Sequence, residues 1–288
     1  KLGDNSVPYV TNIIEKLTTE ISSTTINVIQ TQDINTNTDD NVINESKRLE
    51  PRSSSFVIKK EDDSTHPISK QNTCAVVGNS GILLNSCCGN EIDSNDFVIR
   101  CNIPEIEKYS RDVGTKTNIT NMNTPRVYDL FDHANRDKDS LNLYEEFRFL
   151  NNSILWSRGS TDTVRTSRLD YSIKYLKSKF NLNFPLVYTK GKLQCPVLKN
   201  SVNEIKAPTA GMVAIAEAFC LCEKISVYGF YPFSIGPDGR TIPYHYFGEM
   251  KSKTLDDFDT GHNFKQEYSI LQSLDRDGIL TLVSGKCE

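Results

Sequence analysis

The sequence predicts an α/β protein in which a mostly parallel sheet is covered by helices on both faces and preceded by a disordered stem. From residue 73 onward, short apolar and β-branched runs alternate with longer segments of helical periodicity, as in a parallel sheet. Residues 1–70 are rich in Thr, Asn, Ser and Asp, so they bury too little apolar surface to offset the entropy lost on ordering. We therefore divide the chain into a largely disordered stem, 1–70, and one domain, 71–288.

The first strand and the turn after it are the clearest elements. The run Thr73–Val77 ends in Gly78-Asn79-Ser80-Gly81, and apolar residues resume at 82–84, which indicates a strand, a tight turn and the start of a helix. Glycines let the backbone approach a ligand, and free N–H groups at a helix start favour negative charge. The turn is therefore either an ordinary turn or a phosphate site. A second strand is expected at Phe97–Cys101, with Asn102 at its carboxyl end, where ligands bind in open α/β sheets.

The remaining elements follow from the same periodicity. Strands are expected at 117–121, 153–156, 186–188 and 225–229, and helices from 124, at 169–180 and at 212–222. The only tryptophan, Trp156, falls in a strand and is expected in the core. Because the alternation continues through the chain, we expect a single Rossmann-like domain.

Composition narrows the class of protein. A net charge of −4 and a pI near 5.7 argue against binding to nucleic acid or to a membrane surface by bulk charge. Eight cysteines without a CxxC pair argue against a zinc ribbon and a thioredoxin-like site, and favour disulfides in an oxidising compartment. Two sequons, at Asn118 and Asn151, agree with the secretory pathway and are expected glycosylation sites.

Three later stretches also carry binding or catalytic potential. Pro208-Thr-Ala-Gly211 precedes a predicted helix, and its N–H groups are placed to receive a carboxylate or phosphate, although an ordinary loop has the same pattern. Tyr244-His245 lies in an aromatic cluster, and His262 precedes a helix that carries Glu267. A single histidine is more often structural than catalytic, so these stretches gain weight only together.

Together these stretches resemble the animal sialyltransferases. Cys74–Asn123 is similar to the large sialylmotif of that family, with its Gly-Asn-Ser-Gly turn, Arg-Cys-Asn, and Asp112-Val-Gly-Thr-Lys116. Pro208-Thr-Ala-Gly211 resembles the small sialylmotif, and Tyr-His and then His-x4-Glu follow in the family's order. The segment Cys-Cys-Gly-x-Glu-Ile-Asp93 is similar to the corresponding segment of the α2,8 branch. The chain departs from the family at Ala210, where Ser or Thr is usual, and at Tyr231, where Trp is often found.

The resemblance implies a GT-A-like sialyltransferase variant of the Rossmann-like fold that uses CMP-sialic acid as donor. It would transfer sialic acid, with inversion, to a sialylated glycoprotein or glycolipid in α2,8 linkage. His262 is expected to be the general base, and Tyr244 and His245 are expected to bind the phosphate. The expected substrate-binding residues are Asn79, Ser80, Asn102, Asn123, Thr209, Ala210, Gly211 and Tyr231. No metal and no cofactor are expected. A lysine-rich stretch, residues 177–206, is either a solvated face or a track for an anionic acceptor.

The resemblance also implies disulfides and a location. Cys74 is expected to pair with Cys222, and Cys88 with Cys287, whereas Cys101 is expected to be a buried free thiol. The other three cysteines, Cys87, Cys195 and Cys220, are free or form an extra bridge. A type II membrane protein of the Golgi lumen is expected, with an anchor upstream of Lys1.

Three alternatives stay open at this point. They are a sialyltransferase of α2,3 or α2,6 linkage, a catalytically silent nucleotide- or glycan-binding homologue, and a Rossmann-type oxidoreductase. The last lacks the G-x-G-x-x-G spacing and an acidic residue after the second strand, where Cys101-Asn102 stand.

Overall fold

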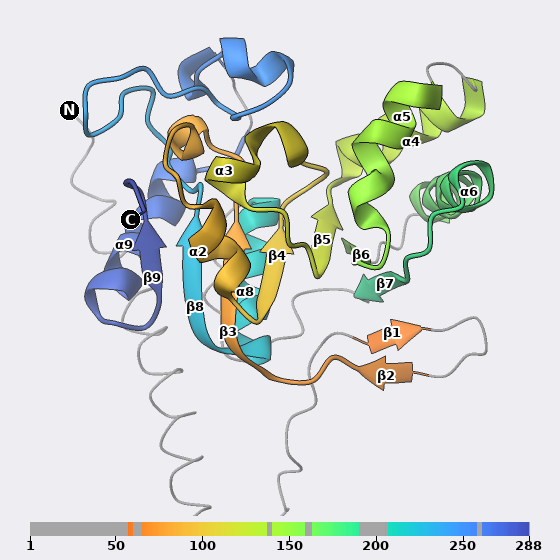
Figure 1. Cartoon of the computed structure of the whole chain (residues 1–288), viewed down its shortest axis with the longest axis horizontal. Coiled ribbons are helices and arrows are strands. Elements are labelled where there is room, and N and C mark those ends of the chain that lie inside the picture. The colour runs from red at the N-terminus through yellow and green to blue at the C-terminus, as the bar shows by residue number, and fades with distance from the viewer. Residues whose placement is uncertain are drawn as a thin grey trace, which may run out of the picture.

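The computed structural model describes residues 57–59, 65–136, 140–158, 163–189, 205, 207–257 and 261–287. In these parts of the chain, a seven-stranded sheet has the order β7-β6-β5-β4-β3-β8-β9, and β1 pairs with β2 in a separate hairpin (Figure 1). All neighbouring strands of the larger sheet are parallel. The expected α/β architecture is therefore confirmed.

The elements have the following bounds. The strands are β1 Val57–Lys59, β2 Thr65–Pro67, β3 Gln71–Val77, β4 Phe97–Arg100, β5 Ile119–Met122, β6 Ile154–Arg158, β7 Leu186–Thr189, β8 Cys222–Tyr228 and β9 Thr281–Val283. The α-helices are α2 Gly89–Ser94, α3 Ser110–Val113, α4 Thr124–Arg136, α5 Ser140–Phe147, α6 Thr163–Phe180, α8 Ala210–Leu221 and α9 Phe264–Arg276. Short 3-10 turns include η1 Gly81–Leu83 and η5 Leu255–Asp257.

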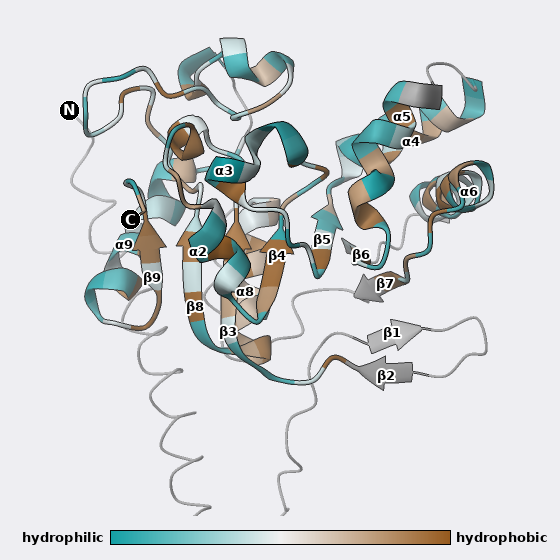
Figure 2. Cartoon of the chain, in the orientation of Figure 1, coloured by the Kyte–Doolittle hydropathy of each residue, from teal (hydrophilic) through white to brown (hydrophobic). Residues whose placement is uncertain are grey.

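The central strands are apolar on both faces because helices cover both. Along β3, Cys74 and Val76 pack into the core beneath α8 and α9, whereas Ala75 and Val77 belong to a second core cluster on the other face. A third cluster lies under α4, α5 and α6. Figure 2 shows brown, hydrophobic residues along the central strands and on α8 behind them, whereas α3 is mostly teal and hydrophilic. The alternation of the β3 side chains between the two clusters is the two-residue period of a strand that is buried on both faces.

Two expectations about helices need correction. The helix expected after Gly81 is only the 3-10 turn η1, because Leu84 is extended and Asn85 and Cys87 have positive φ, which stops a helix. The helix expected at 169–180 begins earlier, at Thr163. The expected strands are present with shifts at their ends, and Trp156 lies in the core with 1% exposure.

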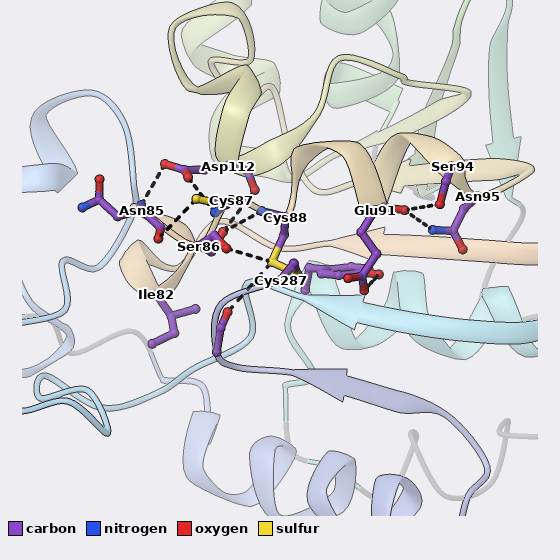
Figure 3. Close-up of a disulfide and its surroundings, with 12 residues drawn as sticks. Ile82, Asn85, Ser86, Cys87, Cys88, Glu91, Ser94, Asn95, Asp112 and Cys287 are labelled. Carbon is purple, nitrogen blue, oxygen red and sulfur yellow. Dashed lines mark hydrogen bonds between the residues drawn. A yellow bond between two sulfur atoms is a disulfide. The ribbon is translucent and has the colours of Figure 1, made fainter.

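The expected disulfides are confirmed: Cys74 pairs with Cys222, and Cys88 with Cys287. Figure 3 shows Cys88–Cys287, which holds the C-terminal tail against the loop before α2, with Cys287 N donating to Ser86 O at 2.9 Å. Cys101 is a buried free thiol, as expected, and burial raises its pKa to about 12. Cys87 is also free, and Cys220 is disulfide-bonded.

Some expectations fall outside the described residues. These are the first 56 residues of the expected stem, Cys195, and most of the lysine-rich stretch, at 190, 192, 199 and 206. No helix in the described ranges is both long and apolar enough to cross a membrane.

Candidate active site

A cleft of about 940 Å³, open to solvent, lies at the carboxyl ends of β3, β4, β5 and β8. Here the strand order reverses, because β3 is followed along the chain by β4 on one side but pairs with β8 on the other. Ligands of open α/β sheets bind at such switch points. All eleven expected catalytic and substrate-binding residues line this cleft: Asn79, Ser80, Asn102, Asn123, Thr209, Ala210, Gly211, Tyr231, Tyr244, His245 and His262.

The glycine turn after β3 is a packing device. The N–H groups of Gly78, Ser80 and Gly81 donate to the carbonyls of Tyr228, Gly229 and Pro243 at 2.7, 3.1 and 3.0 Å. A Cβ on Gly78 would lie 2.5 Å from Gly229 O. The turn therefore needs glycine so that two strand ends can approach, and these three N–H groups are used within the protein rather than offered to a phosphate.

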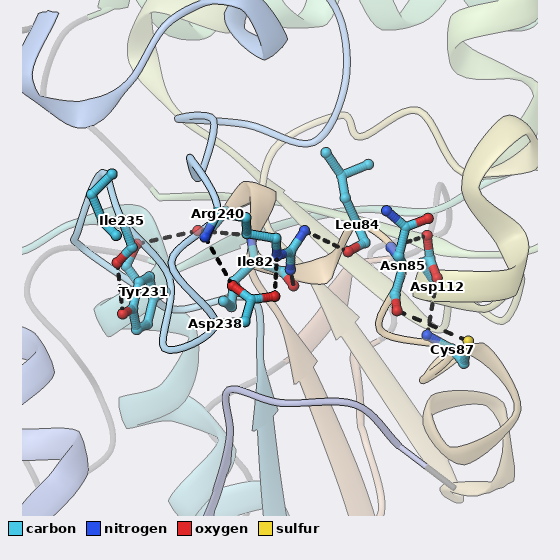
Figure 4. A network of polar contacts seen from close by, with 10 residues as sticks. Ile82, Leu84, Asn85, Cys87, Asp112, Tyr231, Ile235, Asp238 and Arg240 are labelled. Carbon is cyan, nitrogen blue, oxygen red and sulfur yellow. Dashed lines mark hydrogen bonds and ion pairs between the residues drawn. The ribbon is translucent and has the colours of Figure 1, made fainter.

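An arginine of the loop after β8 fixes η1, which directly follows the glycine turn. The Arg240 guanidinium donates to Ile82 O at 2.8 Å and to Leu84 O at 2.7 Å (Figure 4). Beyond it, Asp112 accepts the N–H groups of Asn85 and Cys87 at 2.8 and 3.0 Å. The Asp112 end of the large motif thus supports the turn from outside the cleft.

Asparagine side chains connect the strand ends to one another. Asn121 Oδ1 accepts the N–H of Asn102 at 2.9 Å, and Asn102 Oδ1 accepts the N–H of Asn123 at 3.0 Å. Asn123 Oδ1 in turn accepts the N–H of Arg126. Because the amide oxygens of Asn102 and Asn123 are used in this way, Nδ2 is the group that each offers to a ligand. Asn79 differs: its Nδ2 donates to Cys101 O at 2.9 Å, and its Oδ1 has no partner among the described residues.

The N-terminus of α8 faces the cleft and is capped by Thr209. Thr209 Oγ1 accepts the N–H of Met212 at 3.0 Å, which leaves the first-turn N–H groups of Ala210 and Gly211 without intrahelical partners. A Cβ on Gly211 would lie 2.5 Å from the Phe230 ring, so glycine is needed there.

Glu267 holds this helix start in place. Its two carboxylate oxygens accept the N–H of Thr209 at 2.7 Å and the hydroxyl of Thr209 at 2.6 Å. Glu267 is 5% exposed, and burial raises its pKa, whereas the hydrogen bonds from Thr209 and the charge of His262 act in the opposite direction. Sequence reasoning gave Glu267 no role, although its spacing after His262 was the available signal.

His262 lies at the mouth of the cleft with one ring nitrogen engaged. Its Nδ1 is 2.6 Å from Ala207 O. A carbonyl oxygen can only accept, so Nδ1 carries the hydrogen, and Nε2 is the basic nitrogen of the neutral ring. The Phe264 ring packs against the imidazole edge at 5.7 Å between centroids. The tautomer is therefore the one that a base acting through Nε2 requires.

Tyr244 and His245 form a stacked pair on the wall of the cleft, with centroids 4.4 Å apart. The Phe247 ring also stacks on His245, with centroids 5.5 Å apart. Burial lowers the pKa of His245 to about 4 and raises the pKa of Tyr244. Both groups are therefore neutral near pH 7, and each can donate a hydrogen bond.

Tyr231 belongs to a second aromatic cluster that lines the cleft. Its ring meets those of Phe233 at 5.1 Å and Tyr268 at 5.8 Å, and its hydroxyl donates to Ile235 O at 3.0 Å. Burial raises the pKa of Tyr231. Phe233 and Tyr268 also line the cleft, and the sequence analysis assigned a role to neither of them.

The chain was compared with known proteins. The family model of glycosyltransferase family 29 (sialyltransferase) matches residues 17–279. An alpha-N-acetylneuraminide alpha-2,8-sialyltransferase from Xenopus laevis is 29% identical over 223 residues, 75% of this chain. The chain spans only 59% of that relative's length.

Solved structures agree on the fold. Crystal structures of a mammalian sialyltransferase, alone and in complex with Gal-beta-1-3GalNAc-ortho-nitrophenol, match with TM-scores of 0.50 at 19% and 20% identity. Each match covers 75% of this chain and 70% of the other. Because the family model matches most of the sequence, this chain belongs to glycosyltransferase family 29, the sialyltransferases.

Proposed function

We propose that this protein transfers sialic acid from CMP-sialic acid to a hydroxyl of a sialylated glycan, in α2,8 linkage and with inversion. The observation that carries the proposal is the convergence of His262, the Tyr244–His245 pair and the amide groups of two asparagines in one cleft. Family membership supports the donor and the reaction, and the Xenopus relative supports the linkage.

His262 acts as the general base. Its Nε2 takes the proton of the acceptor hydroxyl while that oxygen bonds to the anomeric carbon of the sialic acid. The bond from this carbon to the phosphate oxygen breaks at the same time, and CMP leaves with the electron pair. Attack from the face opposite the leaving group inverts the anomeric centre.

Neutral hydrogen-bond donors stabilise the negative charge that develops on the phosphate of the leaving CMP. We assign the phosphate to the Tyr244 hydroxyl, an N–H of His245 and Nδ2 of Asn102, with Nδ2 of Asn123 nearby, because donors fixed before the reaction stabilise developing charge. The N–H groups of Ala210 and Gly211, with Thr209 beside them, receive the cytidine or the sialate carboxylate. Ser80 and Asn79 contact the nucleotide, and Tyr231 packs near the cytidine.

The rest of the proposal follows from the family. Residues 71–288 form the catalytic domain, 1–70 form the stem, and the protein works in the Golgi lumen as a type II membrane protein. The reaction needs no metal, because a monophosphate leaving group carries less charge than a diphosphate. Asn118 and Asn151 carry glycans; of the two, Asn151 is the more exposed.

The test measures CMP release from CMP-sialic acid with EDTA present, across sialylated and asialo acceptors. Turnover on sialylated acceptors only, lost in His262→Ala and kept in the control His133→Ala, is expected, since His133 is exposed and does not line the cleft. Turnover on asialo acceptors would overturn the linkage. Loss of turnover on adding EDTA would overturn metal independence, and full activity of His262→Ala would overturn the base.

A further inference from the structure

A second, shallower groove lies between α4 and α6, away from the active-site cleft. Its lining comes from two turns of each helix: Phe131, Asn135, Val164, Ser167, Arg168 and Tyr171. None of these residues lines the cleft. The two helices pack on each other at the outer edge of the sheet, beyond β6 (Figure 1). We call this surface the α4–α6 groove.

The groove holds a positive charge in a fixed place. The Arg168 guanidinium carbon lies 4.7 Å from the centroid of the Tyr128 ring and 5.1 Å from that of Phe131. Asp132, the acidic residue next to Phe131 on α4, pairs instead with Arg136 at 3.9 Å. No carboxylate of the described residues forms an ion pair with Arg168. A planar guanidinium held by aromatic rings is suited to bind a carboxylate through two hydrogen bonds.

The other lining groups fit a sugar ring around that carboxylate. Phe131 and Tyr171 meet edge to face at 5.5 Å, and Tyr171 is 46% exposed. An exposed aromatic ring offers an apolar surface to the C–H face of a pyranose, and the amide of Asn135 and the hydroxyl of Ser167 can bond to sugar hydroxyls. An acidic peptide such as hexaglutamate would use Arg168 but would offer no pyranose face to the exposed ring of Tyr171.

The position of the groove suits a bound acceptor chain. Asn123 lines the cleft, and α4 starts at the next residue. At 1.5 Å per residue, Phe131 is about 12 Å further along the helix, within the span of a short oligosaccharide.

We propose that the α4–α6 groove is a second sialic-acid site, in which Arg168 binds the carboxylate of a sialylated glycan outside the active site. The proposal takes its ligand from the proposed function but does not need the protein to be active. A groove that holds sialic acid would raise the affinity for long sialylated acceptors without touching the reacting atoms.

The direct test is a titration with methyl α-sialoside, followed by NMR, with CMP present at saturation. Arg168→Gln should weaken this binding at least about tenfold, as expected when a charge-assisted pair is lost. Arg111→Gln is the matched control, because Arg111 is exposed on α3 and lines neither site. Affinity for CMP should stay unchanged in both variants. Equal sialoside binding by the wild type and Arg168→Gln would overturn the proposal.

Two further arms separate the remaining explanations. Arg168→Lys keeps the positive charge but loses the planar guanidinium, so this variant should bind the sialoside more weakly than the wild type. It replaces Arg168→Gln as the test if that variant folds poorly. A hexaglutamate peptide that binds as tightly as the sialoside in an Arg168-dependent manner would overturn the sugar as ligand. Failure of the wild type to bind CMP would count against the proposed function, whereas the sialoside titration would still decide the groove.

Discussion

At the scale of single residues, Glu267 is the side chain that joins the two halves of the cleft. It comes from α9, one turn after His262, and both its oxygens bind Thr209 at the start of α8. This buried carboxylate therefore ties the start of α8 to α9, the helix that follows His262. A change at Glu267 should disturb donor binding and proton transfer together.

We expect Glu267→Gln to lower kcat/KM for CMP-sialic acid on the order of 10- to 100-fold. The amide oxygen of glutamine can accept only one of the two hydrogen bonds from Thr209, and the amide NH2 group would face the other Thr209 donor. The control is Glu223→Gln, an exposed carboxylate that pairs with Lys70 at 3.7 Å. Steady-state kinetics with the donor varied are the measurement. Wild-type kinetics in Glu267→Gln would show that the contact with Thr209 is dispensable.

His245 should make stability depend on pH. Its pKa in the folded state, about 4, is below its ordinary value of 6.5 because of burial. Above pH 6.5 the ring is neutral in both states; as the pH falls from about 6.5 to 4, the unfolded state takes up the proton first, so the free energy of unfolding decreases. Urea unfolding between pH 4 and 7 should therefore show a shallower pH dependence in His245→Asn than in wild type.

The control for this prediction is His133→Asn, which removes an exposed imidazole and should leave the wild-type slope unchanged. If the free energy of unfolding depended on pH equally in His245→Asn and in the wild type, burial would not lower the pKa of this ring.

The sequence motifs predicted which residues line the cleft better than they predicted the contacts that place those residues. The eleven expected residues line one cleft, and most of them belong to motifs at a strand end or a helix start, whereas Tyr244 and His245 lie in the loop between β8 and Glu249. The sequence did not predict that the N–H groups of Gly78 and Ser80 bond to backbone carbonyls of the protein. Their acceptors are about 150 residues away in the sequence, on β8 and the loop after it. Glu267 was missed for the same reason: its partner Thr209 is 58 residues distant in sequence. Such pairings are set by the strand order, which no local pattern encodes.

At the scale of elements, long periodic segments were predicted and short ones were not. The strands β3 and β4 and the helix α8 carry strong apolar patterns and lie where expected. Helices α2 and α3 have six and four residues, too few for a helical period to be recognised. The 3-10 turn η1 was expected to be a longer helix, because three apolar residues do not distinguish a single turn from a helix start.

The close approach between the turn after β3 and the end of β8 can be tested by substituting Gly78. Gly78→Ala places a Cβ against the Gly229 carbonyl, a backbone group that cannot rotate away. We expect the free energy of unfolding to fall by about 1–3 kcal/mol, as for overpacked sites, and CMP affinity to fall as well because Asn79 is displaced. Urea unfolding and CMP titration are the measurements.

Gly285→Ala is the matched control, because a Cβ there meets nothing within 4 Å. Equal stabilities of the two variants would mean that the two strand ends separate at little cost.

At the scale of the whole molecule, Cys74–Cys222 and Cys88–Cys287 connect distant parts of the chain, and none of these four cysteines lines the cleft. Cys74–Cys222 joins β3 to the start of β8 across 148 residues, and Cys88–Cys287 joins the loop before α2 to the C-terminal tail across 199. The cleft residues are instead positioned by hydrogen bonds at the strand ends. Stability and binding should therefore respond separately to loss of a disulfide.

We expect the double variants Cys74→Ser/Cys222→Ser and Cys88→Ser/Cys287→Ser each to lose about 5 kcal/mol of unfolding free energy in the loop-entropy model. The two losses should differ by only about 0.3 kcal/mol, because the entropy term grows with the logarithm of loop length. Urea unfolding of both variants measures this difference, and CMP affinity of whichever stays folded should match wild type. A gap well above 1 kcal/mol would contradict loop entropy as the main term and would point to native contacts of Cys74 and Cys222, which lie in the core beneath α8.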